Sequence, residues 1–363
     1  MRSIKKIANY VLLLCLMLCL VLTSGCSKTV KTGISTNDAT ITVTDCVGRE
    51  VKIPAQVNRI ACLCPESVYA LAMFEQGDKI VAVVGGVKRD LILTDKYPQI
   101  KNASVPKSSG AINIEELVRT NPDVVFVKTD SSSNAAEVEK INKSNIPYLV
   151  VDFNNIKEQQ YAMAMIAKAV GISEKAEKYN KYYQSRLELI QKQVADIPRE
   201  QRVRVYHSIN EATRTDIKGS LSSEWLNATG AINVSLDGKL KNLEGKYFAS
   251  LEQILLWNPD VILVNDLGVA DYIMSNKQWA PLKAVENKRV FQLPNGISRW
   301  GHPSSPETPL AIMWTAKTIY PDKFADLDMA AETKNFYREF FSMNLSDEVV
   351  NRILYGGGMR TAR

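Results

Sequence analysis

The stretch IEELVRTNPDVVFV, from Ile114 to Val127, decides the fold because the chain repeats it as LEQILLWNPDVILV from Leu251 to Val264. The two copies align without a gap and share the NPDV tetrapeptide, which begins at Asn121 and again 137 positions later at Asn258. Most of the other positions exchange one aliphatic residue for another. A repeat at this separation is too long for a solenoid period and predicts two lobes of similar topology in one chain.

Each copy predicts a short helix followed by a buried strand. Asn113 with Glu116, and Ser250 with Gln253, have the spacing of capping boxes, so a helix begins at the same place in both copies. The proline of NPDV cannot donate a hydrogen bond and pushes the asparagine before it out of the helical region, so both helices end there. VVFV and VILV are apolar on both faces, which is typical of buried parallel strands.

Glu115 and Glu252 occupy the same offset in the two copies and lie off the apolar stripe of each helix. A glutamate in such a position is usually a solvated surface charge. The equivalent placement of the pair on two lobes favours a shared functional role.

Residues 1–25 have the pattern of a signal peptide. Arg2, Lys5 and Lys6 precede an apolar run from Val11 to Leu22, which at 12 residues is shorter than the ~20 that a membrane span needs. The run leads to LTSGC, which resembles a bacterial lipoprotein signal with Cys26 as the lipidated residue. We therefore expect an extracytoplasmic protein that is lipid-anchored to the bacterial cell membrane; the alternative is an ordinary secreted protein with a buried Cys26.

Length, charge and cysteine count limit what the remaining chain can be. Removal of 25 residues from 363 leaves 338, which is enough for two domains. The signal carries three of the six net positive charges, so the mature chain has a charge of about +3 and is not expected to bind nucleic acid. Cys46, Cys62 and Cys64 remain after export and permit at most one internal disulfide. We expect Cys62 and Cys64 to be buried near a strand end rather than to bind a metal.

Strand and helix patterns alternate along the mature chain and predict an α/β fold with parallel sheets. Residues 26–40 are polar and are expected to form a flexible tether. From Ser173 to Ala195 apolar residues recur at steps of three and four, which predicts a helix of about 34 Å between the lobes. An ordinary helix of the first lobe fits the same pattern. We expect further helices at 310–319, 332–341 and 347–354, and an unstructured GGGMRTAR at the end.

These patterns predict the following domains: a signal peptide at 1–25, the tether at 26–40, an N-terminal α/β lobe at 41–172, a connecting helix at 173–197, and a C-terminal α/β lobe with terminal helices at 198–363.

Enzyme motifs are absent from the sequence. It has no HExxH, GxSxG, P-loop or GxGxxG, and its two histidines, His207 and His302, lie in no recognisable catalytic motif. We therefore expect a protein that is not an enzyme and that holds no resident cofactor or protein-bound metal.

Four segments resemble the class III substrate-binding proteins of ABC importers, which bind iron-siderophores, haem and cobalamin. They are TDCVGREVKIPAQVNRIACLCPES from Thr44, SLEQILLWNPDVILV from Ser250, WAPLKAVENKRVFQLP from Trp279, and SSPETPLAIMWTAKTIY from Ser304. The resemblance implies two Rossmann-like lobes with central parallel sheets, joined by one long α-helix, with the ligand cleft between the lobes. It also implies a monomer whose partners are an ABC permease and its ATPase, with Glu115 and Glu252 meeting arginines of the permease. Cys62 and Cys64 depart from the family pattern.

Loops that follow parallel strands face a ligand site, so we expect ligand-binding side chains there. The candidates are Lys88, Arg89, Lys128, Ser131, Asn134, Asn210, Arg214, Asn265, Arg299, Trp300 and His302. The cations pair with carboxylate, catecholate or oxyanion oxygens, and Trp300 is placed to stack on a flat ligand. We therefore predict an anionic metal chelate, with a ferric siderophore as the first choice and a corrinoid, haem or molybdate-type oxyanion as alternatives. An extracytoplasmic enzyme on a similar frame is the competing class of function, and a purely structural surface lipoprotein is a third.

Overall fold

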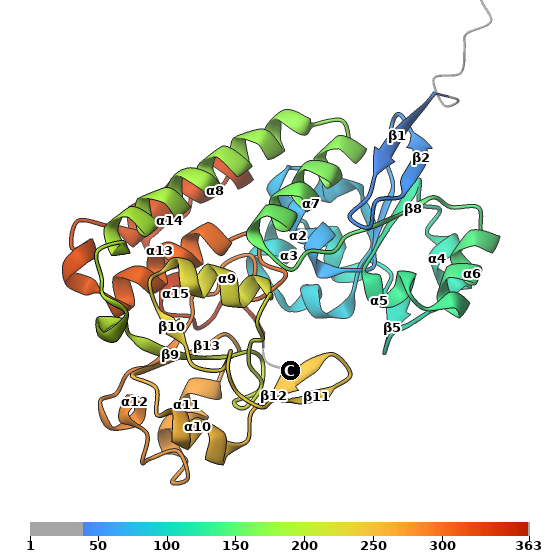
Figure 1. Ribbon diagram of the computed structural model, residues 1–363. Helices are drawn as coiled ribbons and strands as arrows, with labels where there is room; N and C mark the ends of the chain where they lie inside the picture. Colours follow the sequence, from blue (N-terminus) through green and yellow to red (C-terminus); the bar gives the residue numbers. More distant parts are fainter. Residues whose placement is uncertain (1–38, 362–363) are drawn as a thin grey trace, which may run out of the picture. The chain divides into compact units, whose positions relative to one another are not determined.

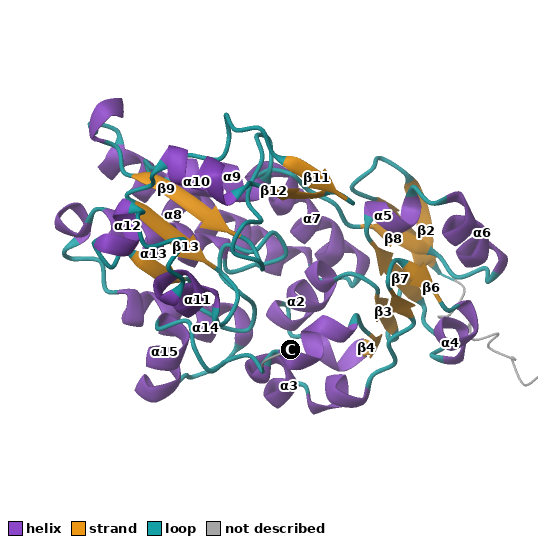
Figure 2. Cartoon of the chain, turned by 90° about the horizontal axis from the view of Figure 1, so that it is seen from below, coloured by secondary structure: helices purple, strands orange, loops and turns teal. Residues whose placement is uncertain are grey.

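Two parallel sheets, one from each half of the chain, organise the protein, whose computed structural model describes residues 39–361 (Figures 1 and 2). The first sheet has the order β4-β3-β7-β8, with β3 (Ile60–Cys62), β4 (Ile80–Ala82), β7 (Val124–Val127) and β8 (Tyr148–Val150). The second has the order β10-β9-β13-β14, with β9 (Arg204–Ser208), β10 (Ile232–Asn233), β13 (Val261–Val264) and β14 (Val290–Gln292). All neighbouring strands are parallel, and in both sheets the first strand lies between the second and the third. The predicted two-lobed α/β fold is confirmed.

The repeated stretch forms the same unit in both lobes. Helices α4 (Ile114–Arg119) and α10 (Leu251–Trp257) begin where the capping residues predict, because Asn113 and Ser250 accept hydrogen bonds from the amides of Glu116 and Gln253. Both helices end before an asparagine with left-handed backbone, φ 45° at Asn121 and φ 42° at Asn258. Asparagine tolerates this region better than most residues, so the turn into β7 and β13 costs little.

An arginine reinforces this unit in each lobe: Arg59 directly precedes β3, and Arg204 is the first residue of β9. The Arg59 side chain donates to the carbonyl oxygens of Thr120 and Asn121, beyond the end of α4. The Arg204 side chain donates to the Trp257 carbonyl oxygen at the end of α10. Guanidinium groups satisfy carbonyls that a helix leaves without intrahelical partners.

Helices and short hairpins surround the first sheet. Strands β1 (Thr40–Thr44) and β2 (Glu50–Pro54) form an antiparallel hairpin, with Ile41 opposite Ile53. The other elements are α2 (Pro65–Met73), α3 (Leu91–Lys96), β5 (Lys107–Ser108), β6 (Ala111–Ile112), α5 (Thr129–Ser132), α6 (Ala135–Lys143) and α7 (Ile156–Ala169), with 3-10 turns at Gly77–Lys79, Gly85–Arg89 and Pro98–Asn102. The serine-rich segment after β7 forms the short helix α5.

The second sheet carries its own helices and one projecting hairpin, β11 (Lys241–Leu243) with β12 (Lys246–Phe248). The helices are α9 (Leu221–Ala228), α11 (Val269–Ser275), α12 (Lys283–Glu286), α13 (Thr308–Ile319), α14 (Met329–Phe341) and α15 (Asp347–Leu354), with 3-10 turns at Arg199–Gln201 and Pro321–Phe324. The three predicted closing helices are confirmed. None of the described helices is long and apolar enough to cross a membrane.

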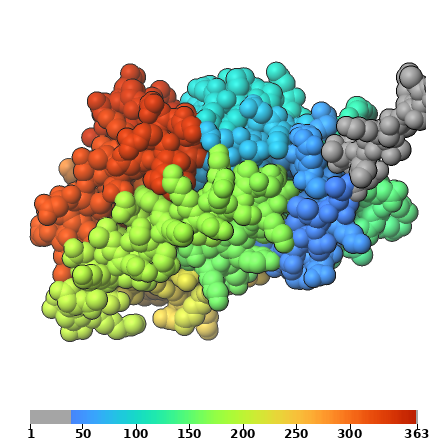
Figure 3. Space-filling model, turned by 90° about the horizontal axis from the view of Figure 1, so that it is seen from above, coloured from blue at the N-terminus to red at the C-terminus, as the bar shows by residue number. Residues whose placement is uncertain are grey.

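Helix α8 (Ser173–Val194) runs from the first lobe to the second over 22 residues, about 33 Å at 1.5 Å per residue. Near its start Lys175 pairs with Glu75, at 2.5 Å, beyond the end of α2. Near its end Val194 packs against Gly230, which follows α9. Between these points α8 lies along α14, where Arg186 pairs with Glu332 (Figure 3). Its buried face consists of the residues that the periodicity predicts: Ala176, Tyr179, Tyr183, Leu187, Ile190 and Val194.

One apolar core is shared between the lobes. It contains Cys62 and Phe126 from the first sheet, Tyr179 from α8, and Val205 and Leu263 from the second sheet. Because the core is continuous across the lobes, they are packed together and not merely tethered.

The end of the chain is ordered and was predicted to be unstructured. The Leu91 amide donates to the Met359 carbonyl oxygen at 3.0 Å, and the Thr361 amide donates to the Arg89 carbonyl oxygen at 2.9 Å. These bonds flank an antiparallel bridge between Asp90 and Arg360. Composition indicated a free tail because three glycines precede it, whereas the residues after the glycines find partners in the first lobe.

Candidate functional site

Both sheets have a topological switch point between the first and third strands, β3 with β7 and β9 with β13. Ligands of open parallel sheets bind beyond the carboxyl ends of the strands at such points. Side chains that follow these strands therefore define the candidate site.

In the first lobe an ion pair bridges the switch point. Lys128 follows β7, and its Nζ lies 2.9 Å from Oε1 of Glu66 at the start of α2, which follows β3. Glu66 is buried, and its Oε2 has no hydrogen-bond partner among the described residues. The Glu66 carboxylate raises the pKa of Lys128 above its ordinary value, so this amine stays charged.

In the second lobe three side chains meet at the switch point. Asn210 lies in the loop after β9, and its backbone N–H donates to Oδ1 of Asn265, which follows β13, at 3.3 Å. Arg299 donates from Nη1 to Oδ1 of Asn210 and lies 3.5 Å from a carboxylate oxygen of Asp266. The Nδ2 of Asn265 is buried without a partner among the described residues.

His302 lies among cations from both lobes. Burial is the main cause that holds the pKa of His302 well below its ordinary value, and the charges of Arg299, Arg214, Lys128 and Arg360 act in the same direction. The ring is partly accessible to solvent but densely surrounded. The Ser304 amide donates to Nδ1 of His302 at 3.3 Å, which leaves the proton of the neutral ring on Nε2 as a donor.

Arg214 completes the cationic cluster, which we define as Lys128, Arg214 and Arg299, three cations around the neutral His302. It lies 3.6 Å from Glu211, and its segment is fixed by an antiparallel bridge between Arg214 and Phe248 of β12. The projecting hairpin thus holds one cation of the cluster in place.

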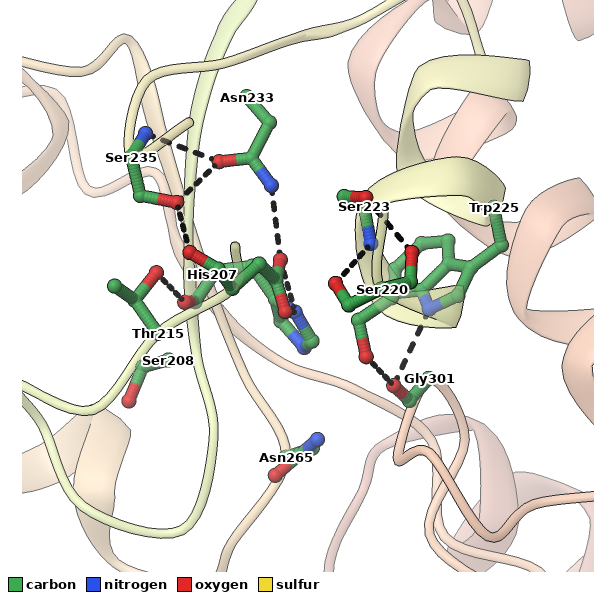
Figure 4. A network of polar contacts seen from close by, with 12 residues as sticks. His207, Ser208, Thr215, Ser220, Ser223, Trp225, Asn233, Ser235, Asn265 and Gly301 are labelled. Carbon is green, nitrogen blue, oxygen red and sulfur yellow. Dashed lines mark hydrogen bonds and ion pairs between the residues drawn. The ribbon is translucent and has the colours of Figure 1, made fainter. Parts of the chain in front are cut away.

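A second polar network lies beside β9 (Figure 4). Nδ1 of His207 lies 3.0 Å from Oδ2 of Asp216, which also accepts from Nδ2 of Asn233 at 2.9 Å. A carboxylate at Nδ1 keeps a proton on that nitrogen and orients the imidazole ring. The Nε2 of His207 is buried without a partner among the described residues. The network orients His207 at the carboxyl end of β9, and nothing in the sequence pattern pointed to it.

The structure thus brings together Lys128, Asn210, Arg214, Asn265, Arg299 and His302, six of the predicted ligand-binding residues. Two further predicted cations make main-chain contacts elsewhere. Lys88 donates to the Ala103 carbonyl oxygen at 2.6 Å. Arg89 donates to the Thr361 carbonyl oxygen from Nε and Nη2 at 3.0 and 2.7 Å, so it holds the chain end.

Three predicted ligand contacts are corrected by the structure. Trp300 is fully buried and donates its indole N–H to Glu307 at 2.8 Å, so it is not available to stack on a ligand. Asn134 is the N-cap of α6 and accepts from the amides of Ala136 and Glu137, which occupies its side-chain oxygen. Ser131 is buried in α5, and its hydroxyl donates to Asp130.

One residue of the site was missed. Arg360, from the chain end, lies close enough to Arg299 and His302 to lower the pKa of both. Its partner Asp90 is 270 positions away in the sequence, and no local pattern indicates the pairing.

Glu115 and Glu252 are exposed, each in the first turn of its helix. A hydrogen bond to its own backbone amide, followed by one to Ser250, lowers the pKa of Glu252, so its carboxylate is charged at neutral pH. Their placement fits contact with a partner and not with a ligand at the strand ends.

The cysteines form neither a disulfide nor a metal site in the described chain. Cys46, Cys62 and Cys64 are free, and no group of three or more metal-ligating side chains occurs between residues 39 and 361. Burial raises the pKa of Cys64 to about 12 and that of Cys46 to about 11, which keeps both thiols protonated. Burial of Cys62 and Cys64 beside β3 confirms the sequence prediction.

The fold and the cluster between the two sheets define a two-lobed α/β binding protein. The chain matches the periplasmic binding protein family over residues 60–296, which is more than half of its length, and it belongs to that family.

Three curated relatives are 22–26% identical to this chain over the aligned residues. The molybdate-binding protein MolA of Haemophilus influenzae is 26% identical over 82% of this chain and 90% of its own length. YvrC of Bacillus subtilis, named as an uncharacterized ABC transporter substrate-binding lipoprotein, is 26% identical over 86% of this chain and 97% of its own. YxeB of the same organism, an iron(3+)-hydroxamate-binding protein, is 22% identical over 78% of this chain and 88% of its own.

Solved structures agree with this assignment. MolA bound to molybdate superposes with a TM-score of 0.75 at 26% identity, covering 84% of this chain and 99% of MolA. A periplasmic solute binding protein from Veillonella parvula gives 0.74 at 26% identity, covering 87% of this chain and 97% of that one.

Proposed function

We propose that this chain is the extracytoplasmic solute-binding component of an ABC importer and that it captures an anionic metal compound for delivery to a permease. The observation that carries the proposal is the cationic cluster, to which both lobes contribute at their switch points. Guanidinium and ammonium groups pair with the oxygens of carboxylates, catecholates and oxyanions. The protein itself is proposed to hold no cofactor and to contact the ligand as a whole.

The sequence pattern made a ferric siderophore the first choice of ligand; we now propose a molybdate-type oxyanion as the first candidate and keep the ferric siderophore as the second. The similarity to MolA and the small exposed fraction of the Arg299 side chain, 13%, favour the compact oxyanion. The burial of Trp300 removes the one aromatic group that was predicted to stack on haem or a corrinoid, so these flat ligands lose their support.

Docking to the permease is proposed to use Glu115 and Glu252, which the repeat places equivalently on the two lobes. Attachment to the cell membrane is proposed to use a lipid on Cys26, which lies outside the described residues. Both assignments fit a monomer that carries one ligand to a two-fold permease.

Calorimetric titration of the purified protein tests the proposal. The probes are molybdate, ferric citrate, a ferric hydroxamate, cyanocobalamin and haemin, each at low and at high salt. Tight binding of one anionic probe that weakens as salt rises supports the proposal, because salt screens the attraction between a charged ligand in solution and the cationic cluster. Binding of a neutral probe only, without salt dependence, contradicts it, and chemical conversion of any probe indicates the competing enzyme class.

A further inference from the structure

The chain end delivers a buried guanidinium to the candidate site. Arg360 is 7% exposed, pairs through Nη1 with Asp90, and donates from Nη2 to the Gly86 carbonyl oxygen at 2.9 Å. Its Nε is buried and has no hydrogen-bond partner among the described residues. A buried N–H without a partner costs free energy that a ligand oxygen would recover.

A second buried guanidinium lies close by. Burial is the main cause that lowers the pKa of Arg299, and the charge of Arg360 is the next. The two groups come from different parts of the chain, yet the fold holds them together although like charges repel. Such an arrangement is stabilised when an anion is placed between or beside the two groups.

The positive charges of the two arginines are not neutralised to the same extent by the carboxylates near them. Asp90 is fully buried, pairs with Arg360 and accepts from the Tyr69 hydroxyl at 2.6 Å. Asp266 lies 3.5 Å from Arg299, beyond the ordinary length of a charge-assisted hydrogen bond. The neutral His302 adds no charge of its own and presents Nε2–H as a donor.

Resting on the proposed function, we infer that Arg360 is a ligand-binding residue and that Arg360 and Arg299 together hold one anionic oxygen-bearing group of the transported ligand. The group is an oxyanion or a carboxylate of a metal chelate. In the absence of ligand, Asp90 is the counter-ion of Arg360, and the Nε–H stays available for the incoming oxygen. The last residues of the chain are then part of the binding site.

A purely structural role for Arg360 predicts a different response to substitution. If the pair with Asp90 only fastened the chain end to the first lobe, then Arg360→Gln and Asp90→Asn would weaken ligand binding in the same direction. If Arg360 binds the ligand, Arg360→Gln removes an attractive charge, whereas Asp90→Asn removes a competing negative charge. In that case Arg360→Gln weakens ligand binding, whereas Asp90→Asn strengthens it or leaves it unchanged.

The experiment compares Arg360→Gln, Arg360→Lys and Asp90→Asn with Arg352→Gln as the matched control. Arg352 is exposed and donates to the Gly358 carbonyl oxygen, so it contacts the same tail outside the site. Full-length variants are titrated calorimetrically with molybdate and with ferric citrate after circular dichroism has confirmed that each is folded.

We expect Arg360→Gln to bind about tenfold to a hundredfold more weakly, as loss of a charge-assisted hydrogen bond requires. Arg360→Lys should also lose affinity, because lysine keeps the charge but not the planar fork. Asp90→Asn should bind as tightly as the unaltered protein or more tightly, and Arg352→Gln should be unchanged.

Two results overturn the inference alone. They are unchanged binding by Arg360→Gln, and equal weakening by Arg360→Gln and Asp90→Asn. Failure of the unaltered protein to bind either probe, or any other anionic probe of the panel, overturns the proposed function and the inference with it.

Discussion

Arg59 and Arg204 make equivalent contacts in the two lobes: Arg59 directly precedes β3, Arg204 is the first residue of β9, and each donates its side chain to a main-chain carbonyl oxygen at the end of the repeated helix. The aspartate of each NPDV tetrapeptide bonds to the same arginine through the main chain. The Asp123 amide donates to the Arg59 carbonyl oxygen, and the Asp260 amide donates to the Arg204 carbonyl oxygen, both at 2.8 Å. The similarity between the lobes therefore includes the contact of each repeated stretch with the neighbouring strand, β3 in the first lobe and β9 in the second. This places Glu115 and Glu252 in equivalent local surroundings.

Replacing Glu115 and Glu252 together with alanine should abolish ligand uptake by cells while ligand affinity stays within about twofold of the unaltered protein. Both carboxylates are exposed and lie outside the cationic cluster, so the proposed docking role predicts no loss of ligand binding. Transport assays with labelled ligand and calorimetry on the purified variant give the two readings.

The matched control replaces Glu174 and Glu286, which are also exposed helical glutamates. This control should transport normally. Full transport by the Glu115 and Glu252 double variant would exclude the docking role.

Substitution of Arg299 with alanine should weaken binding of the anionic ligand by about 1.5–3 kcal/mol, the usual worth of a hydrogen bond to a charged group. Arg299 already donates one hydrogen bond to Asn210, so one of its N–H groups is occupied before the ligand arrives and the others are available to it. Calorimetry at two salt concentrations measures the loss. A variant with unchanged affinity and unchanged salt dependence would place the ligand elsewhere.

His302 should make the protein less stable as the pH falls below about 6.5. Burial, with the charges of four neighbouring cations, holds the pKa of the folded His302 well below 6.5, the ordinary value for an unfolded chain. The unfolded chain therefore takes up a proton that the folded chain does not, and the free energy of unfolding decreases as the pH falls from about 6.5 toward the folded pKa.

In His302→Asn this contribution disappears. Urea unfolding at pH 7.5, 6.5 and 5.5 measures the free energy of unfolding of both proteins. Below pH 6.5 the value for the variant should rise relative to that of the unaltered protein by roughly 1.4 kcal/mol per pH unit. Parallel stability curves for the two proteins would contradict the assignment.

Glu307 should be essential to the stability of the second lobe. It is fully buried and accepts four hydrogen bonds, from Trp300 Nε1, the Tyr337 hydroxyl, and the amide and hydroxyl of Ser298. Glu307→Gln replaces one acceptor oxygen with an NH2 group and leaves two donors facing it, which should cost about 2–4 kcal/mol. Urea unfolding measures this loss, and Glu286→Gln, at an exposed position, should change stability by less than about 0.5 kcal/mol.

Cys26→Ser should release the protein from the membrane into the soluble fraction. The apolar run before Cys26 is too short to span a bilayer, so a lipid on this cysteine is the proposed attachment. Fractionation of cells that express each form, followed by immunoblotting, measures the change. A variant that stays in the membrane fraction would place the anchor elsewhere.

The sheets could be predicted from the sequence because their determinants are local. NPDV, the caps at Asn113 and Ser250, and the apolar runs after them lie within a few residues of one another. The buried face of α8 could be predicted for the same reason, since its apolar residues recur with the helical period.

The site could be predicted only in part because its contacts join residues far apart in the sequence. Lys128 and Arg299 follow strands and were found by that rule, whereas the pairs Lys128 with Glu66 and Arg360 with Asp90 have no local signal. Asn134 was assigned to the ligand although Glu137, three residues later, is a signal for a helix cap. No local pattern around Trp300 indicates that a buried carboxylate accepts a hydrogen bond from its indole N–H.

The docking of Arg360 sets an order on folding. Asp90 precedes Arg360 by 270 residues, so its carboxylate is synthesised long before this cationic partner. A buried carboxylate without that partner is costly, so the region around Asp90 cannot reach its final stability until Arg360 has been added. Completion of the first lobe therefore waits for the segment from Met359 to Thr361.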